Sequence, residues 1–122
     1  MTVGDTRGNM MESQTDKLNR EIKQNKAQIK DAEAYARLVN NADFKHVVQD
    51  MYFRQHTLGL VMARGNPNIE EGQLDSITKQ LDGIAYFNNF LHYIKQTGVE
   101  AVTALKERET TRIHLVDGDS DD

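Results

Sequence analysis

The chain has 122 residues, which suits one domain, and its hydrophobic content of 38% allows only a thin core. Its formal net charge of -4 argues against a general nucleic-acid binder, because such proteins present a basic face to the phosphates. No cysteine is present, which excludes a disulfide framework and a zinc site built on thiolates.

Residues 1–13 predict a flexible N-terminus. Gly4 and Gly8 stand there among polar side chains, and such a segment buries too little apolar surface to fix itself. The segment lacks the hydrophobic core of a signal peptide, and no apolar run in the chain is long enough to cross a bilayer. We therefore expect an intracellular protein without a membrane span.

A first helix is expected to begin at Ser13, because Asp16 follows it three residues later as in a capping box with the shorter acid. From Leu18 to Val39, apolar or small residues recur at alternating intervals of four and three, which is typical of a coiled-coil seam. The oligomer seam that this pattern predicts comprises Leu18, Ile22, Asn25 and Ile29. A buried asparagine in such a seam fixes the register at some cost in stability. A surface helix with a narrow apolar stripe is the other interpretation.

A second helix is expected to begin at Asn41 or Asp43, whose short side chains can accept backbone N–H bonds of the first turn. Apolar side chains then recur at intervals of three and four, giving a broad apolar face. They are Phe44, Val47, Val48, Met51, Tyr52, Leu58, Val61 and Met62. We expect this helix to end near Arg64, because Gly65 suits a left-handed cap and Pro67 cannot continue a helix.

A third helix is expected to begin at Asn68, with Glu70 and Glu71 near the positive end of its dipole. The helical period continues to about Arg108, so we expect one long helix, straight or bent at Gly98. Residues 110–116 then alternate weakly like a strand. Residues 110–122 are therefore expected to form an extended acidic tail.

These segments together predict an all-α protein. An N-terminal coiled-coil-like helix is followed by an antiparallel helical hairpin, with mobile termini on either side of a helical domain at residues 14–109. We expect large side chains from both helices of the hairpin to form its packed centre. They are Phe44, Met51, Tyr52, Phe87, Leu91 and Ile94.

The sequence contains no pattern that predicts catalysis or a cofactor. Its histidines are His46, His56, His92 and His114. None stands four residues from another, so the simplest helical metal pair is missing. Glycine-rich phosphate loops and nucleophile elbows are also missing. We therefore predict no catalytic, cofactor-binding or metal-binding residues. Because the aromatic residues lie on or beside apolar stripes with few charges nearby, core packing is a better interpretation than base stacking.

Two stretches, "ADFKHVVQDMYFRQHTLGLVMARGNP" and "LDGIAYFNNFLHYIKQTGVEAV", resemble a family of small helical proteins of tailed bacteriophages. Members of that family pair an Asn-x-x-Phe helix bearing a Tyr-Phe dipeptide with a loop ending near proline. A helix of the form Ile-x-x-Ile…Phe-x-x-x-Ile…Gly follows. The matching residues here are Phe44, Tyr52, Phe53, Pro67, Ile84, Phe90, Ile94 and Gly98. The resemblance covers residues 16–107, and the chain departs from the family in its mixed helix-end charges and in the tail "RIHLVDGDSDD".

The resemblance implies a phage gene product of the head, packaging or virion-assembly group, with no catalytic residues to carry over. We therefore expect a non-enzymatic structural or assembly protein that forms homo-oligomers and contacts other virion proteins, in the virion or the host cytoplasm. The alternative is a small regulatory protein that binds a host or phage enzyme, or nucleic acid. An enzyme with a composite site between subunits is the third interpretation.

Overall fold

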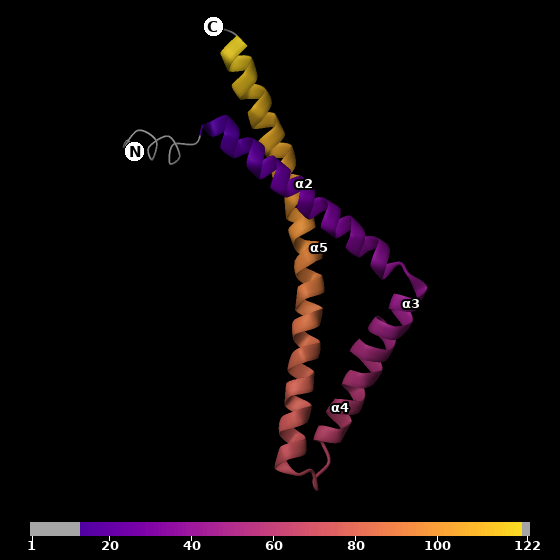
Figure 1. Cartoon of the computed structure of the whole chain (residues 1–122). Helices are drawn as coiled ribbons and strands as arrows, with labels where there is room; N and C mark the ends of the chain where they lie inside the picture. Colours follow the sequence, from indigo (N-terminus) through magenta and orange to yellow (C-terminus); the bar gives the residue numbers. More distant parts are fainter. Residues whose placement is uncertain (1–12, 121–122) are drawn as a thin grey trace, which may run out of the picture. The chain divides into compact units, whose positions relative to one another are not determined.

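A computed structural model of the chain describes the backbone of residues 13–120 and the side chains of residues 13–116, and every regular element in this range is a helix (Figure 1). The elements are α2 (Gln14–Val39), α3 (Ala42–Phe44), the π-helix η1 (Lys45–His56), α4 (Thr57–Arg64) and α5 (Glu71–Ser120). Because α3, η1 and α4 follow one another without a gap, they form one helical segment. The predicted all-α fold is confirmed.

The chain divides into two compact units. Within the described range, unit 1 comprises residues 13–31 and 97–120, which hold the first part of α2 and the C-terminal part of α5. Unit 2 comprises residues 32–96 and holds the end of α2, the segment α3–η1–α4 and the first half of α5. Both long helices therefore contribute residues to both units.

Short polar side chains determine where the first two helices begin. The hydroxyl oxygen of Ser13 accepts the backbone N–H of Asp16 at 3.0 Å, and Oδ1 of Asn41 accepts the backbone N–H of Phe44 at 3.0 Å. Each bond satisfies a donor that the first turn of a helix leaves without an intrahelical partner. The cap predicted at Ser13 is confirmed, and of the two residues considered for the second helix the structure uses Asn41.

The loop between α4 and α5 differs from the expectation. Gly65 has φ -76° and ψ -5°, so it does not form the predicted left-handed cap. The turn is held by Asn66, whose Oδ1 accepts the backbone N–H of Asn68 at 3.0 Å, while its carbonyl oxygen accepts the N–H of Ile69 at 3.1 Å. A side chain that bonds the backbone two residues on makes such a turn without a positive φ.

Helix α5 begins later than the predicted cap at Asn68. Its first residue is Glu71, and the carbonyl oxygen of Glu70 accepts the N–H of Leu74 at 3.0 Å. The side chain of Gln73 reaches back and accepts the N–H of Glu70 at 3.3 Å, which is the reciprocal bond of a capping box. The side chain of Asn68 does not make this cap, because the residue belongs to the preceding turn.

The core of unit 2 lies between α4 and α5, which run in opposite directions (Figure 1). Leu60 of α4 is buried together with Ile77 and Ile84 of α5. The partly buried side chains packed against them are Tyr52, Phe53, Ile69 and Leu81. Ile77, Ile84 and the buried Leu91 recur every seven residues, the spacing that keeps one face of a helix against a neighbour. This confirms the predicted antiparallel hairpin.

The π-helix η1 determines which side chains of the second helical segment face inward. Its backbone bonds span five residues, so its turns are wider than those of an α-helix. Partly buried side chains recur in this segment at intervals of four to five residues, namely Phe44, Val48, Tyr52 and Thr57; Asp50 and Phe53 are also partly buried. Met51 follows Phe44 by seven residues. This spacing is almost two turns of an α-helix, which would place both side chains on one face, but it falls well short of two turns of a π-helix. Met51 is therefore 45% exposed, outside the packed centre in which the sequence placed it.

Helix α5 continues past Gly98, where the sequence left a bend open, and through the segment that the sequence predicted to be extended. Gly98 is buried within a continuous helix, and residues 110–116 are helical where an extended segment was expected. Thr110 and Thr111 donate their hydroxyl protons to the carbonyl oxygens of Lys106 and Glu107, both at 2.9 Å. Such bonds to the preceding turn accommodate threonine in a helix. The predicted mobility of residues 1–12 and 121–122 lies outside the described residues.

We expect Leu60→Ala to destabilise the protein by about 2 to 5 kcal/mol, because the substitution leaves a cavity against Ile77 and Ile84. Urea denaturation followed by helical circular dichroism measures this change in the free energy of unfolding. The matched control is Met62→Ala in the same helix, where the side chain is 70% exposed and the cost should stay within about 0.5 kcal/mol. Equal effects of the two substitutions would contradict the described core.

Candidate interaction surfaces

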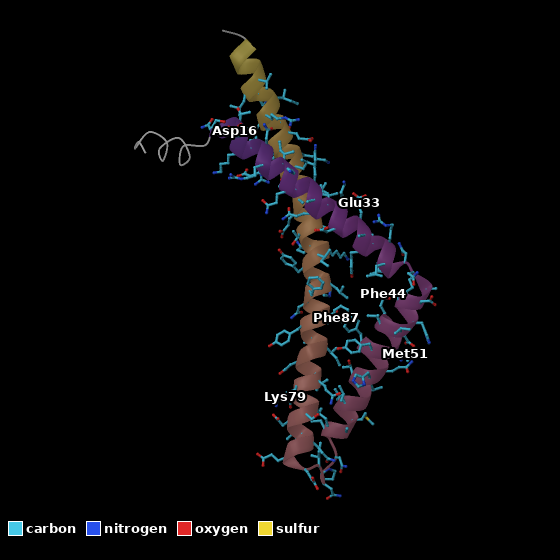
Figure 2. All side chains as sticks on the ribbon, viewed as in Figure 1. Asp16, Glu33, Phe44, Met51, Lys79 and Phe87 are labelled. Carbon is cyan, nitrogen blue, oxygen red and sulfur yellow. The ribbon has the colours of Figure 1, made fainter. Side chains whose placement is uncertain are left out.

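An aromatic cluster joins η1 to α5 in unit 2 (Figure 2). The ring centroids of Phe53 and Phe87 are 5.5 Å apart, and those of Tyr52 and Phe87 are 6.0 Å apart. The rings are tilted against each other, an arrangement that aromatic pairs prefer because of their quadrupoles. His56 stacks on Tyr52 with the centroids 6.0 Å apart. The structure thus brings together two of the predicted packing residues, Tyr52 and Phe87.

A shallow hollow lies beside this cluster. Its lining consists of Phe53, Thr57, Leu81, Ile84, Ala85 and Asn88. A second hollow at the loop end of the hairpin is lined by Ala63, Asn66, Ile69, Gly72, Gln73, Ser76 and Ile77. Neither lining contains a titratable side chain, whereas acid–base catalysis requires such groups within reach of a substrate.

A polar network joins α2 to α5 in unit 1. The guanidinium group of Arg108 donates from Nε to Oε2 of Glu21 at 2.9 Å and from Nη1 to Oδ1 of Asn25 at 2.8 Å. Asn25 in turn donates from Nδ2 to Oε1 of Gln28 at 3.1 Å. Only 8% of Asn25 is exposed, so its amide group depends on these partners.

This network changes the interpretation of the predicted oligomer seam. Ile22 and Asn25 are buried in unit 1, and Arg108 of the same chain occupies the hydrogen-bonding position of Asn25. Leu18 and Ile29 are half-buried. The Asn25 face of α2 thus contacts α5 of the same chain, and the contact between copies stays a prediction. A specific polar bond in an otherwise apolar contact fixes one register, here between two segments of one chain.

The other predicted packing residues have mixed surroundings. Leu91 is buried, whereas Phe44 and Ile94 are half-buried. Sequence reasoning missed Arg108 and the buried small residue Ala101. A lone arginine near the end of a helical pattern carries no signal that its partner lies on another helix. The burial of Ala101 could have been read from the continuation of the apolar stripe past Gly98.

Helix η1 carries an exposed charge cluster around Asp50. Arg54 donates from Nε to Oδ1 of Asp50 at 2.7 Å, and its Nη2 pairs with the same oxygen. Gln55 donates from Nε2 to Oδ2 at 2.8 Å across five residues, which one turn of the π-helix brings together. The hydrogen bond from Arg54, with the charge of Arg54, the bond from Gln55 and the charge of His46 adding to it, holds the pKa of Asp50 below its ordinary value of 3.8.

Two exposed apolar surfaces lie on the outer sides of the helices of unit 2. The first, called here the aromatic stripe, comprises Tyr86, Phe90 and Tyr93 of α5, which are 72%, 58% and 65% exposed. The second, called the α4 patch, comprises Leu58, Val61 and Met62, all exposed. Single exposed apolar residues are common, whereas large contiguous apolar patches often mark interaction sites.

Among the side chains of residues 13–116, no group of three or more His, Cys, Asp or Glu is placed to hold a metal ion. No helix within residues 13–120 has the length and apolar character that crossing a membrane requires. Comparison of the chain with models of known protein families, with curated proteins and with solved structures gave no match. The role of the interaction surfaces is therefore inferred from their geometry and composition alone.

We expect Arg108→Ala to destabilise the protein by about 1 to 3 kcal/mol, because Oδ1 of the buried Asn25 loses its donor. Chemical denaturation measures the loss. The control is Lys26→Ala, which removes an exposed ion pair with Glu109 at 4.0 Å and should cost less than about 0.5 kcal/mol. The double variant Asn25→Leu/Arg108→Met should recover most of the stability, because it leaves no buried polar group of the pair unsatisfied. A double variant as unstable as Arg108→Ala would contradict this role.

We expect the carboxyl group of Asp50 to titrate below 3.8 when followed by NMR, and Arg54→Met to move its midpoint upward. Because the folded-state pKa is lowered, the ionised form stabilises the fold above the unfolded-state pKa, and this contribution disappears as the pH falls through the folded-state value. An unchanged midpoint in Arg54→Met would show that the pair is not formed in solution.

Proposed function

We propose that the protein is a non-enzymatic structural or assembly protein of a tailed bacteriophage. It acts through contacts of its helix faces with further copies of itself and with other virion proteins. The observation that carries this proposal is the apolar surface that the helices of unit 2 leave uncovered, namely the aromatic stripe and the α4 patch.

These surfaces support an interaction role because of where they lie. The buried side chains of unit 2 form one narrow seam between α4 and α5, whereas the stripe and the patch carry large apolar side chains outside that seam. Aromatic residues and methionine are enriched in protein interfaces, whereas lysine, glutamate and aspartate are depleted there. Tyr86, Phe90, Tyr93 and Met62 fit this composition.

The assignment to a phage rests on the resemblance of residues 16–107 to the phage family. Residues that carry this resemblance lie both in the aromatic cluster and on the aromatic stripe. Tyr52 and Phe53 belong to the aromatic cluster, and Phe90 is the middle residue of the aromatic stripe. A family of assembly proteins would need both a cluster that holds the hairpin and a surface that meets a partner.

Quantitative mass spectrometry of virions and assembly intermediates, purified by sedimentation from cells infected with the encoding phage, tests this proposal. We expect the chain at a fixed ratio to the major capsid protein in at least one of these particles. A scaffold that leaves would appear in the intermediates alone. Absence from all particles, together with a soluble complex with one enzyme, would contradict the proposal and favour a regulatory protein.

A further inference from the structure

The aromatic stripe lies on the face of α5 opposite to its own core. Tyr86 and Tyr93 each follow a buried seam residue, Ile84 and Leu91, by two positions, which corresponds to about 200° around an α-helix. Phe90 lies between the two tyrosines on the same face. None of these three rings therefore takes part in the packed core of unit 2.

The surroundings of the stripe show what kind of partner fits it. From Gly83 to Ile94, α5 contains no Asp, Glu, Lys or Arg residue; Asp82 and Lys95 stand at the two ends of this run. A groove that binds single-stranded nucleic acid combines aromatic rings with cations, and this run has none. An uncharged surface instead meets another uncharged surface without electrostatic cost, which an identical stripe provides.

We propose that the aromatic stripe is the contact between two copies of this chain, packed antiparallel about a two-fold axis next to Phe90. The order Tyr, Phe, Tyr reads the same in both directions, and its spacing of four and three is nearly symmetric. In this arrangement Tyr86 faces Tyr93 of the partner subunit, and the two Phe90 rings meet at the axis. A two-fold interface requires this kind of self-complementary surface.

The stripe supplies about half of the area that such a contact needs. An aromatic side chain buries about 150 to 250 Å² when covered, so the exposed fractions of 72%, 58% and 65% correspond to roughly 400 Å² per copy. A stable interface buries about 800 Å² per partner. The rings thus supply about half of that area, and the helix turns on either side supply the remainder when two helices pack lengthwise.

The position of Gly83 next to the stripe is compatible with this contact. A glycine inside a helix is destabilising relative to alanine, and a Cβ atom at Gly83 would meet nothing within 4 Å. The packing of its own chain therefore gives no reason for a glycine here. Gly83 lies three residues before Tyr86 and seven before Phe90, on the same face. The missing side chain allows the helix of a partner to approach the end of the stripe closely.

Disulfide mapping tests the arrangement directly, because the chain has no cysteine of its own. Two residues form a disulfide only when their Cα atoms come within about 7 Å. Under mild oxidation, Phe90→Cys alone should form a covalent dimer. Tyr86→Cys and Tyr93→Cys should each remain uncrosslinked alone but should crosslink when mixed. Crosslinking of Tyr86→Cys with itself would overturn the antiparallel arrangement.

The matched control for this mapping is Leu58→Cys on the α4 patch, which is exposed to a similar degree and should not form a dimer. The inference rests on the proposed self-association, and the outcomes separate the two. If Leu58→Cys forms the covalent dimer and Phe90→Cys does not, the chain self-associates but the aromatic stripe is not the interface. A chain that stays monomeric at the highest soluble concentration overturns both.

Sedimentation equilibrium of variants gives a second, independent measurement. Phe90→Ala should raise the dimer dissociation constant about tenfold or more while the helical circular dichroism stays unchanged, because the ring has no role in the core. Gly83→Ala should raise the melting temperature through helix propensity and yet weaken the dimer. Gly59→Ala in α4, where a Cβ also meets nothing within 4 Å, should raise the melting temperature without weakening the dimer. Equal dimer affinities for the two glycine variants would overturn the role of Gly83.

Discussion

Two helices in contact can cover only one stripe on each other, and this constraint governs the described part of the chain. Every large apolar side chain is either in a narrow seam or on the surface, because no third layer encloses it. In unit 2 the seam contains Leu60, Ile77 and Ile84, and the aromatic rings of η1 extend it. Large apolar side chains outside this seam, among them those of the aromatic stripe and the α4 patch, are exposed, and their positions carry the functional argument.

The alignment of the packed helices is fixed by different interactions in the two units. Unit 2 relies on shape, because the tilted rings of Tyr52, Phe53 and Phe87 interlock across the hairpin. Unit 1 relies on a directed polar bond, because Arg108 can satisfy the amide of Asn25 in only one alignment of the helices. Arginine suits this role, since its guanidinium group remains charged and presents several donors in a fixed plane.

Several predictions that depend on near neighbours succeeded, although the caps predicted at Gly65 and Asn68 were wrong because Asn66 forms the turn there. The caps at Ser13 and Asn41 and the helical period of α5 involve residues within one turn of each other. Sequence reasoning was wrong where the backbone geometry departs from the α-helical period, as at Met51 in the π-helix, and at residues 110–116, where α5 continues as a helix through Thr110 and Thr111. The bond between Asn25 and Arg108 was out of reach, because the two residues are 83 positions apart and no local pattern pairs them.

The aromatic stripe also gives the protein an optical property. The chain has no tryptophan and four tyrosines, so tyrosine dominates its near-ultraviolet emission. Tyr86 and Tyr93 belong to the stripe, whereas Tyr35 and Tyr52 are half-buried. Half of the fluorophores therefore stand on a single water-facing surface. Quenching by a small soluble agent such as acrylamide reports, without any label, whether that surface is open or covered.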